Sequence, residues 1–419
     1  MRPSLSRAVV SSIIASVAAA ASARAQAPLP PHPTLDDLLV RAASASPALL
    51  LARLATDSAG GELRIAQARP NPQFQAIQNT PYQYGIFLQL EGGPARSARI
   101  AAARAALAAT RGDSADAARV VRALVRQGWY DLLLAEAQRD LAARTREIYR
   151  QLLQGDSVRL RAGDVAERNV VKGQLELSRA EATLAQAAAG ARGARVLLQS
   201  LVGITAPDTG FTVAGALDFR TAPAPLDSAL PLALATRPDA QAAGARITQG
   251  AELRRQASRL WIPLPQVSLV GQHNARAFEP DVPWTVGNGR IAAGLALPLP
   301  LLYRYRGEVE RATAGAEAAQ VNAIRTRIAI AGEVTGAIDA YRATRAIAER
   351  YEGGLLRQAE TALDQARYAY RGGAISLLDL LDAIRTYEDT YGDRLQALHD
   401  YWIAVTAVNR AIGRDLLPQ

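Results

Sequence analysis

The chain repeats one order of elements, and this repetition limits the possible folds more than any other feature of the sequence. Each half is predicted to contain a helix, two short strands, a long helix, a sharp reversal and a final helix. Leu35-Asp-Asp37 precedes Leu226-Asp-Ser228 by about 190 residues, and Gly163 precedes Gly373 by about 210. The shared order predicts a first structural repeat at 26–203, a linker or equatorial segment at 204–224, a second repeat at 225–413 and a C-terminal tail at 414–419.

The N-terminus is typical of a secretory signal peptide at residues 1–25. Arg2 and Arg7 flank the start of an apolar segment, and Ala23-Arg-Ala25 fits a small-residue cleavage site. A membrane-anchoring helix is the alternative, although the segment is short for a span. The chain has no cysteine, so we expect neither disulfides nor a lipid-modified N-terminal cysteine.

Two pairs of alternating segments interrupt the helical pattern. The first pair lies at about residues 73–90 and the second at about 265–297. Four strands cannot close a barrel in a membrane, because open edges would leave backbone groups unpaired in lipid. Three chains would supply twelve strands, so the pattern predicts a trimer if the strands cross a membrane. A small soluble sheet that caps a coiled coil is the alternative.

The long helices of the second half carry two features of their own. Apolar side chains recur three or four residues apart along them, which predicts a packed seam. Gly353-Gly354 interrupts the first of these helices. We expect a kink or a change of helical pitch there.

A sharp reversal near the C-terminus carries two acidic side chains. Gly372-Gly373 is predicted to end one helix, and Ser376 to cap the next. Asp379 and Asp382 are three residues apart, so they share one face of that helix near its start. The two carboxylates therefore either belong to a capped turn or line a narrow gate.

The sequence contains no motif of a catalytic, metal-binding or cofactor-binding site. His32, His273 and His399 are far apart and lack metal-ligand spacing. The net charge of +9 comes almost entirely from arginines interleaved with acidic residues, which does not indicate nucleic-acid binding. We therefore predict a protein that is not an enzyme, with no cofactor, no bound metal and no nucleic acid as a partner.

At the second reversal, Tyr370-x-Gly372-Gly373-x-x-Ser376-x-x-Asp379-x-x-Asp382-Ala383 and the order of elements together resemble the TolC-like outer-membrane efflux proteins. The resemblance covers about Leu35 to Gly413. It implies a mainly α fold with a small transmembrane β part, internally duplicated. In that fold a trimeric 12-stranded β-barrel, with four strands from each chain, continues into a long α-helical barrel. The implied location is the outer membrane of a Gram-negative-type cell, with the protein projecting into the periplasm.

The resemblance also implies a function. Such a protein is the outer-membrane channel-tunnel of a tripartite efflux system and passively conducts substrates to the outside. Its partners would be two further copies in a homotrimer, a periplasmic adaptor protein, an inner-membrane transporter of the RND type and outer-membrane lipid. Two alternatives stay open: the outer-membrane conduit of a type I protein secretion system, and a periplasmic coiled-coil adaptor or scaffold protein.

In the family, the helical tips form the periplasmic entrance, which side-chain links close and aspartate rings line. By this resemblance Asp379 and Asp382 are the rings, and Tyr370 is a link residue. Ile375 stands where the best-known member has an arginine, and Asn169, beside Arg168, stands where it has an aspartate. These are possible gate-link positions. The surface expected to meet the adaptor consists of glycines at the two tips: Gly163, Gly372 and Gly373.

Overall fold

The computed structural model describes residues 29–78, 82–208, 210–221, 226–273 and 290–417. The predicted signal peptide at 1–25 lies outside these residues, as do parts of the predicted linker and tail. The chain divides into two compact units. The first comprises Met1–Ala52, Asp116–Arg237 and Ile330–Gln419, and the second comprises Arg53–Ala115 and Pro238–Ala329. Each unit thus combines segments from both predicted repeats.

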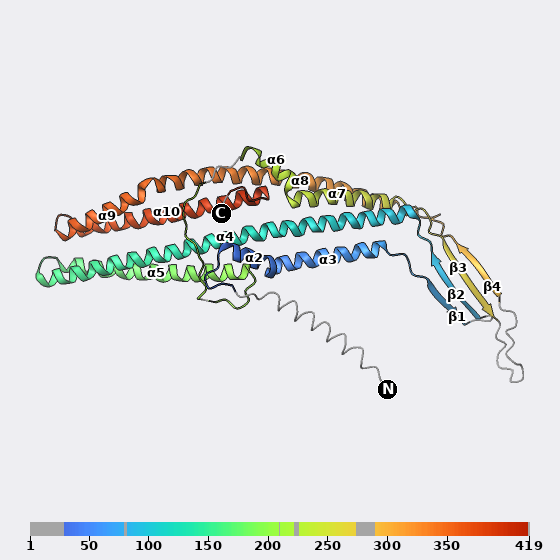
Figure 1. Ribbon diagram of the computed structural model, residues 1–419, viewed down its shortest axis with the longest axis horizontal. Helices are drawn as coiled ribbons and strands as arrows, with labels where there is room; N and C mark the ends of the chain where they lie inside the picture. The colour runs from blue at the N-terminus through green and yellow to red at the C-terminus, as the bar shows by residue number, and fades with distance from the viewer. Residues whose placement is uncertain (1–28, 79–81, 209, 222–225, 274–289, 418–419) are drawn as a thin grey trace, which may run out of the picture. The chain divides into compact units, whose positions relative to one another are not determined.

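The described chain is mainly helical, and its helices and strands are labelled in Figure 1. The helices are α2 (Leu35–Ala45), α3 (Pro47–Gln67), α4 (Gly93–Ala162), α5 (Glu167–Leu201), α6 (Ala229–Thr236), α7 (Pro238–Ala257), α8 (Arg306–Arg350), α9 (Leu356–Arg371) and α10 (Leu377–Ile412). A single 3₁₀ turn at Leu226–Ser228 precedes α6. No described helix is by itself both long and apolar enough to cross a membrane, and only the bent pair α2–α3 passes that test when its two helices are taken together.

The first predicted helix of each repeat is in fact two helices. Ser46 separates α2 from α3, and Arg237 separates α6 from α7; both have an extended backbone, with ψ of 124° and 131°. Each stands before a proline, Pro47 or Pro238, whose ring disfavours a helical conformation in the preceding residue. The proline then starts the next helix, where its missing N–H has no cost.

A π-helical turn at Tyr351–Leu355 separates α8 from α9. Gly354 has a φ of 119° there, a conformation that side-chain-bearing residues rarely adopt. The predicted interruption at Gly353-Gly354 is confirmed.

The second unit contains one antiparallel sheet in the order β1-β2-β3-β4. Its strands are β1 (Gln73–Ile77), β2 (Tyr82–Gln89), β3 (Gln266–His273) and β4 (Arg290–Ala296). Both predicted strand pairs form. In addition, β2 pairs with β3 along its whole length, from Tyr82 opposite His273 to Gln89 opposite Gln266, and so joins the two halves of the sequence.

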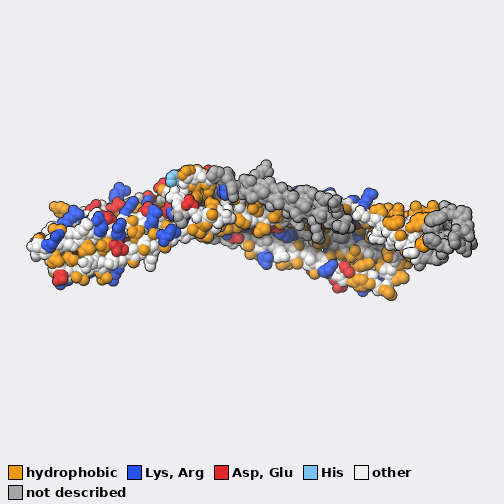
Figure 2. Space-filling view, turned by 90° about the horizontal axis from the view of Figure 1, so that it is seen from below, with side chains coloured by type: hydrophobic (Ala, Val, Ile, Leu, Met, Phe, Trp, Pro, Cys, Tyr) orange, Lys and Arg blue, Asp and Glu red, His pale blue; other side chains and the backbone are white. Residues whose placement is uncertain are grey.

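The strand register gives this sheet two different faces. Ile86 lies opposite Phe74 on one side and Leu269 on the other, and directly opposed residues share a face. The face that contains Ile86 is apolar and exposed: Phe74, Tyr84, Ile86, Leu88, Val267, Leu269, Ile291 and Leu295. Hydrophobic side chains gather at the surface of this part of the chain (Figure 2). The other face carries six glutamines and Ser268 together with Ile77, Phe87 and Val270.

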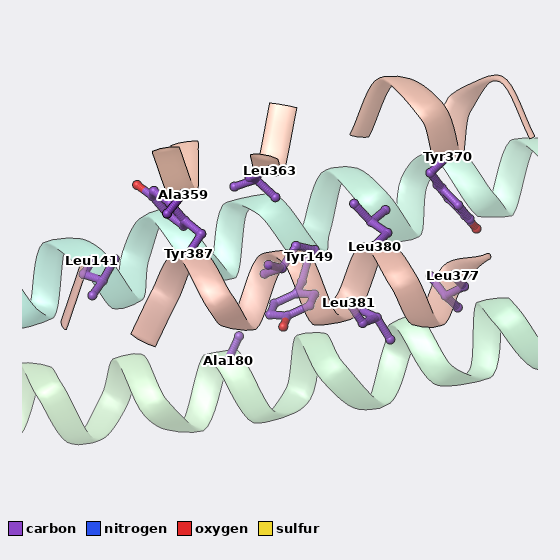
Figure 3. Packing of buried hydrophobic residues seen from close by; sticks show 11 residues of the cluster. Leu141, Tyr149, Ala180, Ala359, Leu363, Tyr370, Leu377, Leu380, Leu381 and Tyr387 are labelled. Atoms are coloured by element: carbon purple, nitrogen blue, oxygen red, sulfur yellow. The ribbon is translucent and has the colours of Figure 1, made fainter. Parts of the chain in front are cut away.

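In the first unit, the α4–α5 hairpin and the α9–α10 hairpin lie side by side (Figure 1). Their facing sides bury a hydrophobic cluster that includes Tyr149 of α4, Ala180 of α5, Leu363 of α9 and Leu381 of α10 (Figure 3). Full burial of one such leucine contributes about 2 kcal/mol to stability. The predicted seam is confirmed along α10, where Leu381, Ile384, Leu398, Val405 and Ile412 are almost fully buried.

Candidate functional site: the tips of the helical hairpins

The first tip joins α4 to α5 through Gly163. Gly163 has a φ of 84° and donates its N–H to the carbonyl of Leu160 at 3.0 Å, and the N–H of Asp164 reaches the carbonyl of Arg159 at 2.9 Å. These two hydrogen bonds form a Schellman motif, which satisfies the last carbonyls of α4. Ala166 precedes α5 and provides no side-chain cap.

The second tip joins α9 to α10 with the same pattern. Gly373 has a φ of 73° and donates to the carbonyl of Tyr370 at 3.1 Å, and Ala374 donates to the carbonyl of Ala369 at 2.8 Å. Gly163 and Gly373 therefore occupy equivalent backbone positions in two Schellman motifs. In both tips the turn requires glycine at one position only, since Gly372 keeps a negative φ of −79°.

Ser376 and Asp379 form a capping box at the start of α10. The N–H of Asp379 donates to Ser376 Oγ at 3.3 Å, and Asp379 Oδ2 accepts from the N–H and the hydroxyl of Ser376 at 2.9 and 2.7 Å. The side-chain and backbone hydrogen bonds from Ser376 lower the pKa of Asp379. Asp379 thus stays ionised and exposed while it caps the helix, and the predicted N-cap at Ser376 is confirmed.

Asp382 lies one turn further along α10 and is exposed. It makes no hydrogen bond or ion pair with any described residue. Its neighbour Arg385 is instead paired with Glu176 of α5 at 3.0 Å. The tip therefore presents two exposed carboxylates, of which only Asp379 has a structural role within the chain.

Tyr370 links the two hairpins. Its hydroxyl donates to both carboxylate oxygens of Asp156 on α4 at 2.9 Å, and only 6% of Tyr370 and 2% of Asp156 is exposed. Arg159, one turn further along α4, donates to the Tyr370 carbonyl at 3.3 Å and lies 5.4 Å from the centre of its ring. The buried phenol and carboxylate thus tie α9 to α4 close to both tips.

Burial controls the protonation of this pair. Burial raises the pKa of Tyr370 to about 12, and the hydrogen bond to Asp156 acts in the same direction. Burial also raises the pKa of Asp156, although the hydrogen bond from Tyr370 and the charge of Arg159 oppose that shift. At neutral pH the phenol therefore remains a donor.

Asp156 is the site residue that sequence reasoning missed. It lies 214 residues from Tyr370, so no local pattern connects the two. One signal was present: Ala142, Tyr149 and Asp156 recur every seven residues along α4, and all three are buried. A carboxylate that continues a buried stripe needs a buried partner.

The three predicted gate-link positions have different surroundings. Asn169 lies close enough to Tyr370 for a side-chain hydrogen bond that lowers the tyrosine pKa. Ile375 is partly buried and packs against the hydrophobic cluster of the hairpins. Arg168 is exposed on the first turn of α5 and makes no bond to a described residue. Of the three, Asn169 is the one that lies within hydrogen-bond reach of the Tyr370 hydroxyl.

A sequence comparison identifies the family of the chain. The family described as "Outer membrane efflux protein" matches residues 229–414. The cobalt-zinc-cadmium resistance protein CzcC of Cupriavidus metallidurans is 30% identical over 410 residues, which cover 91% of this chain and 90% of CzcC. The chain belongs to the outer-membrane efflux protein family. The predicted resemblance to TolC-like proteins is confirmed, and so is the outer-membrane location with a periplasmic projection.

Solved structures show the same fold as this outer-membrane efflux protein. The outer membrane protein VceC of Vibrio cholerae has a TM-score of 0.77 at 21% identity, with 91% of this chain and 96% of VceC covered. The CmeC outer membrane channel of Campylobacter jejuni has a TM-score of 0.79 at 17% identity, with 91% of this chain and 86% of CmeC covered. The mainly helical fold with one small sheet is therefore the fold of outer-membrane channels.

Among the residues with described positions, no group of three or more histidine, aspartate or glutamate side chains is arranged to hold a metal ion. Charged side chains are instead interspersed along the helical hairpins (Figure 2).

Proposed function

We propose that three copies of this chain form the channel-tunnel of a tripartite efflux system. The channel would conduct substrates passively from an inner-membrane transporter and a periplasmic adaptor to the outside. In this assembly a 12-stranded β-barrel, with four strands from each chain, continues into a long α-helical barrel, as in the TolC-like family.

The two-faced sheet carries this proposal. Transmembrane barrels present an apolar surface to lipid and a polar surface to their lumen. Here the exposed apolar face suits outer-membrane lipid, and the glutamine-rich face suits a water-filled interior. Strands β1 and β4 are the edges of the sheet within one chain, and edges in lipid need neighbouring strands. Neighbouring copies of the same sheet would supply them.

The backbone supports the proposed duplication into repeats at 26–203 and 225–413. Gly163 and Gly373 end α4 and α9 with positive φ, and Gly203 and Gly413 follow α5 and α10 with φ of 76° and 82°. Both pairs are separated by the interval already seen in the sequence. Duplication of an ancestral segment that contained one helical hairpin accounts for this agreement.

At the periplasmic end we propose a gate built from the second tip. Tyr370 and Asp156 would hold the α9–α10 hairpin closed against α4, and opening would require their hydrogen bond to break. Asp379 and Asp382, repeated three times around a narrow entrance, would give a strongly negative potential that favours cations. Gly163, Gly372 and Gly373 would form the surface that meets the adaptor hairpins.

The proposed substrates are divalent metal cations. CzcC is named for resistance to cobalt, zinc and cadmium, and it aligns with this chain over nine-tenths of its length. The exposed carboxylates of the tip have the charge that such ions require. The transporter would then be of the RND type, as the resemblance to the TolC-like proteins implies.

The decisive experiment tests the channel proposal and the substrate proposal separately. The chain should run as a heat-modifiable trimer in outer-membrane fractions, and its deletion should lower tolerance to cobalt, zinc and cadmium without changing tolerance to hydrophobic drugs. A soluble monomer would disprove the channel proposal. A membrane trimer whose loss changes drug tolerance alone would disprove only the metal assignment.

A further inference from the structure

Five arginines line a small cavity in the first unit. The cavity has a volume of about 90 Å³ and lies between α4 and the C-terminal end of α10. Three of the arginines share one face of α4, and two flank the end of α10: Arg119, Arg122, Arg126, Arg410 and Arg414. Among the described residues of the lining, Asp415 is the single carboxylate.

The chain reversal after α10 brings these side chains together. α10 ends at Gly413, which has a φ of 82° and donates to the carbonyl of Asn409 at 3.0 Å. The buried Asn409 side chain accepts from the N–H groups of Leu416 and Leu417 at 2.9 and 3.0 Å and donates to the Leu417 carbonyl at 2.9 Å. The segment with Arg414 is therefore held firmly against the end of α10.

Two of the arginines already have partners. Arg119 is buried, pairs with Asp116 at 2.7 Å and donates to the carbonyl of Arg410 at 2.6 Å. Arg126 makes a two-pronged ion pair with Asp415, with both contacts at 2.7 Å. These contacts neutralise two guanidinium groups and hold the cavity wall in place.

The remaining donors have no partner in the described chain. The side chains of Arg122, Arg410 and Arg414 are exposed and make no hydrogen bond or ion pair with a described residue. Arg126 Nε is buried without a hydrogen-bond partner, in a side chain that is only 13% exposed. Three unpaired guanidinium groups and one buried N–H thus surround the same small space.

We propose that this cavity binds one tetrahedral oxyanion of the phosphate or sulfate type. Several like charges so close together repel each other, and a doubly charged anion would remove this repulsion. Guanidinium groups bind such oxyanions through paired, charge-assisted hydrogen bonds. The volume suits a single phosphate group. The site is independent of the tips and of the proposed transport function.

Two sources could supply this chemistry: free inorganic phosphate, or the phosphomonoester of a larger molecule. The full-length protein in detergent is titrated calorimetrically with inorganic phosphate and, separately, with glycerol 3-phosphate, at constant ionic strength in chloride. We expect saturable binding of phosphate at one site per chain, with competition by sulfate. Binding of phosphate alone would assign the free ion, and binding of both would assign a phosphomonoester group.

Substitutions test whether the arginines make the site. The double variant Arg122→Gln with Arg414→Gln should bind phosphate at least about tenfold more weakly, since each hydrogen bond between charged groups contributes that much. The matched control, Arg192→Gln with Arg325→Gln, makes the same charge change at exposed positions elsewhere and should bind like the wild type. Thermal unfolding gives a second readout, because phosphate should raise the melting temperature of the wild type and the control but not of the double variant.

Three results would overturn the proposal. The wild type could show no saturable binding of either anion. Both pairs of substitutions could weaken binding equally, which would indicate a general effect of net charge. The double variant, folded as judged by circular dichroism, could bind phosphate as tightly as the wild type.

Discussion

The hydroxyl of Tyr370 donates a hydrogen bond to each carboxylate oxygen of Asp156 at 2.9 Å, and this buried contact joins the two helical hairpins near their tips. A buried carboxylate without a partner is costly, so the link favours the arrangement in which the two hairpins are packed together. Removal of this one hydroxyl should therefore change both the stability of the packed hairpins and the conductance of the channel.

Removal of the Tyr370 hydroxyl tests this link directly. Tyr370→Phe should lower the free energy of unfolding of the helical unit by about 2 kcal/mol, because the buried Asp156 carboxylate loses the hydrogen bond that it accepts from the phenol. In planar bilayers, the same variant should show a larger or longer-lived open conductance. Tyr368→Phe is the matched control: Tyr368 is 83% exposed and should leave both measurements unchanged. A closed channel of normal conductance in Tyr370→Phe would contradict the gate.

The contribution of Tyr370 to the free energy of unfolding should also depend on pH. The folded state holds the Tyr370 proton up to a pKa of about 12, whereas an unfolded tyrosine ionises near the ordinary value of 10.0. The stabilisation of the folded state by the protonated Tyr370 is therefore complete below pH 10 and is lost as the pH rises towards 12. Tyr370→Phe should reduce the decline in stability over that range. Denaturant unfolding of both proteins at several pH values measures the difference, and parallel curves would argue against a buried, hydrogen-bonded phenol.

His399 connects α10 to α4 and should make stability depend on pH near neutrality. Its Nε2 lies 2.7 Å from Asp131, and its Nδ1 lies 3.1 Å from Asp400. Burial lowers the pKa of His399, but the hydrogen bonds and the negative charges of Asp131 and Asp400 together outweigh burial and raise it above 6.5. The stabilisation is complete below pH 6.5 and is lost as the pH rises through the raised pKa. Asp131→Asn should flatten the change in unfolding free energy between pH 6 and 8, and His399→Gln should abolish it.

Glycine has opposite effects on stability inside α4, at Gly155, and directly after the helix ends, at Gly163. Gly163→Ala should destabilise the first tip by about 1 kcal/mol, because a side chain makes the left-handed conformation unfavourable. Gly155→Ala should stabilise the same helix by about 0.5–1 kcal/mol, since Gly155 lies inside α4 and an added Cβ meets nothing within 4 Å. Thermal unfolding of the two variants gives the comparison. Equal effects would show that the tip does not need a positive φ.

The acidic tip allows capping to be separated from charge. Ser376→Ala removes the capping box and should cost about 1 kcal/mol of stability while both carboxylates remain. Asp382→Asn should leave stability unchanged and reduce cation selectivity and block by divalent cations in planar bilayers. The double change Asp379→Ala with Asp382→Ala should combine the two effects. If Ser376→Ala changes the cation selectivity and Asp382→Asn does not, the carboxylates do not line the entrance.

Local chemistry in the sequence was sufficient for many features of the fold. The capping box of Ser376 and the left-handed glycines of the tips involve residues a few positions apart. Alternation located all four strands for the same reason, because side chains of a strand point to alternating faces. The sequence therefore determined where the strands and the helical tips lie, and which family the chain resembles. The helix breaks before Pro47 and Pro238 were not predicted, although each proline is a local signal for a helix boundary.

The tertiary structure alone decided which distant residues meet. Packing between distant parts of the chain brings together three sets of partners: Asp156 and Tyr370, β2 and β3, and the arginines on α4 and at the end of α10. Such contacts depend on how whole helices and strands lie against one another. A burial pattern in one helix gives its inward face but does not identify the partner on the next. For this reason the carboxylates of the tip could be predicted from the sequence, while the partner of Tyr370 and the arginine cavity could not.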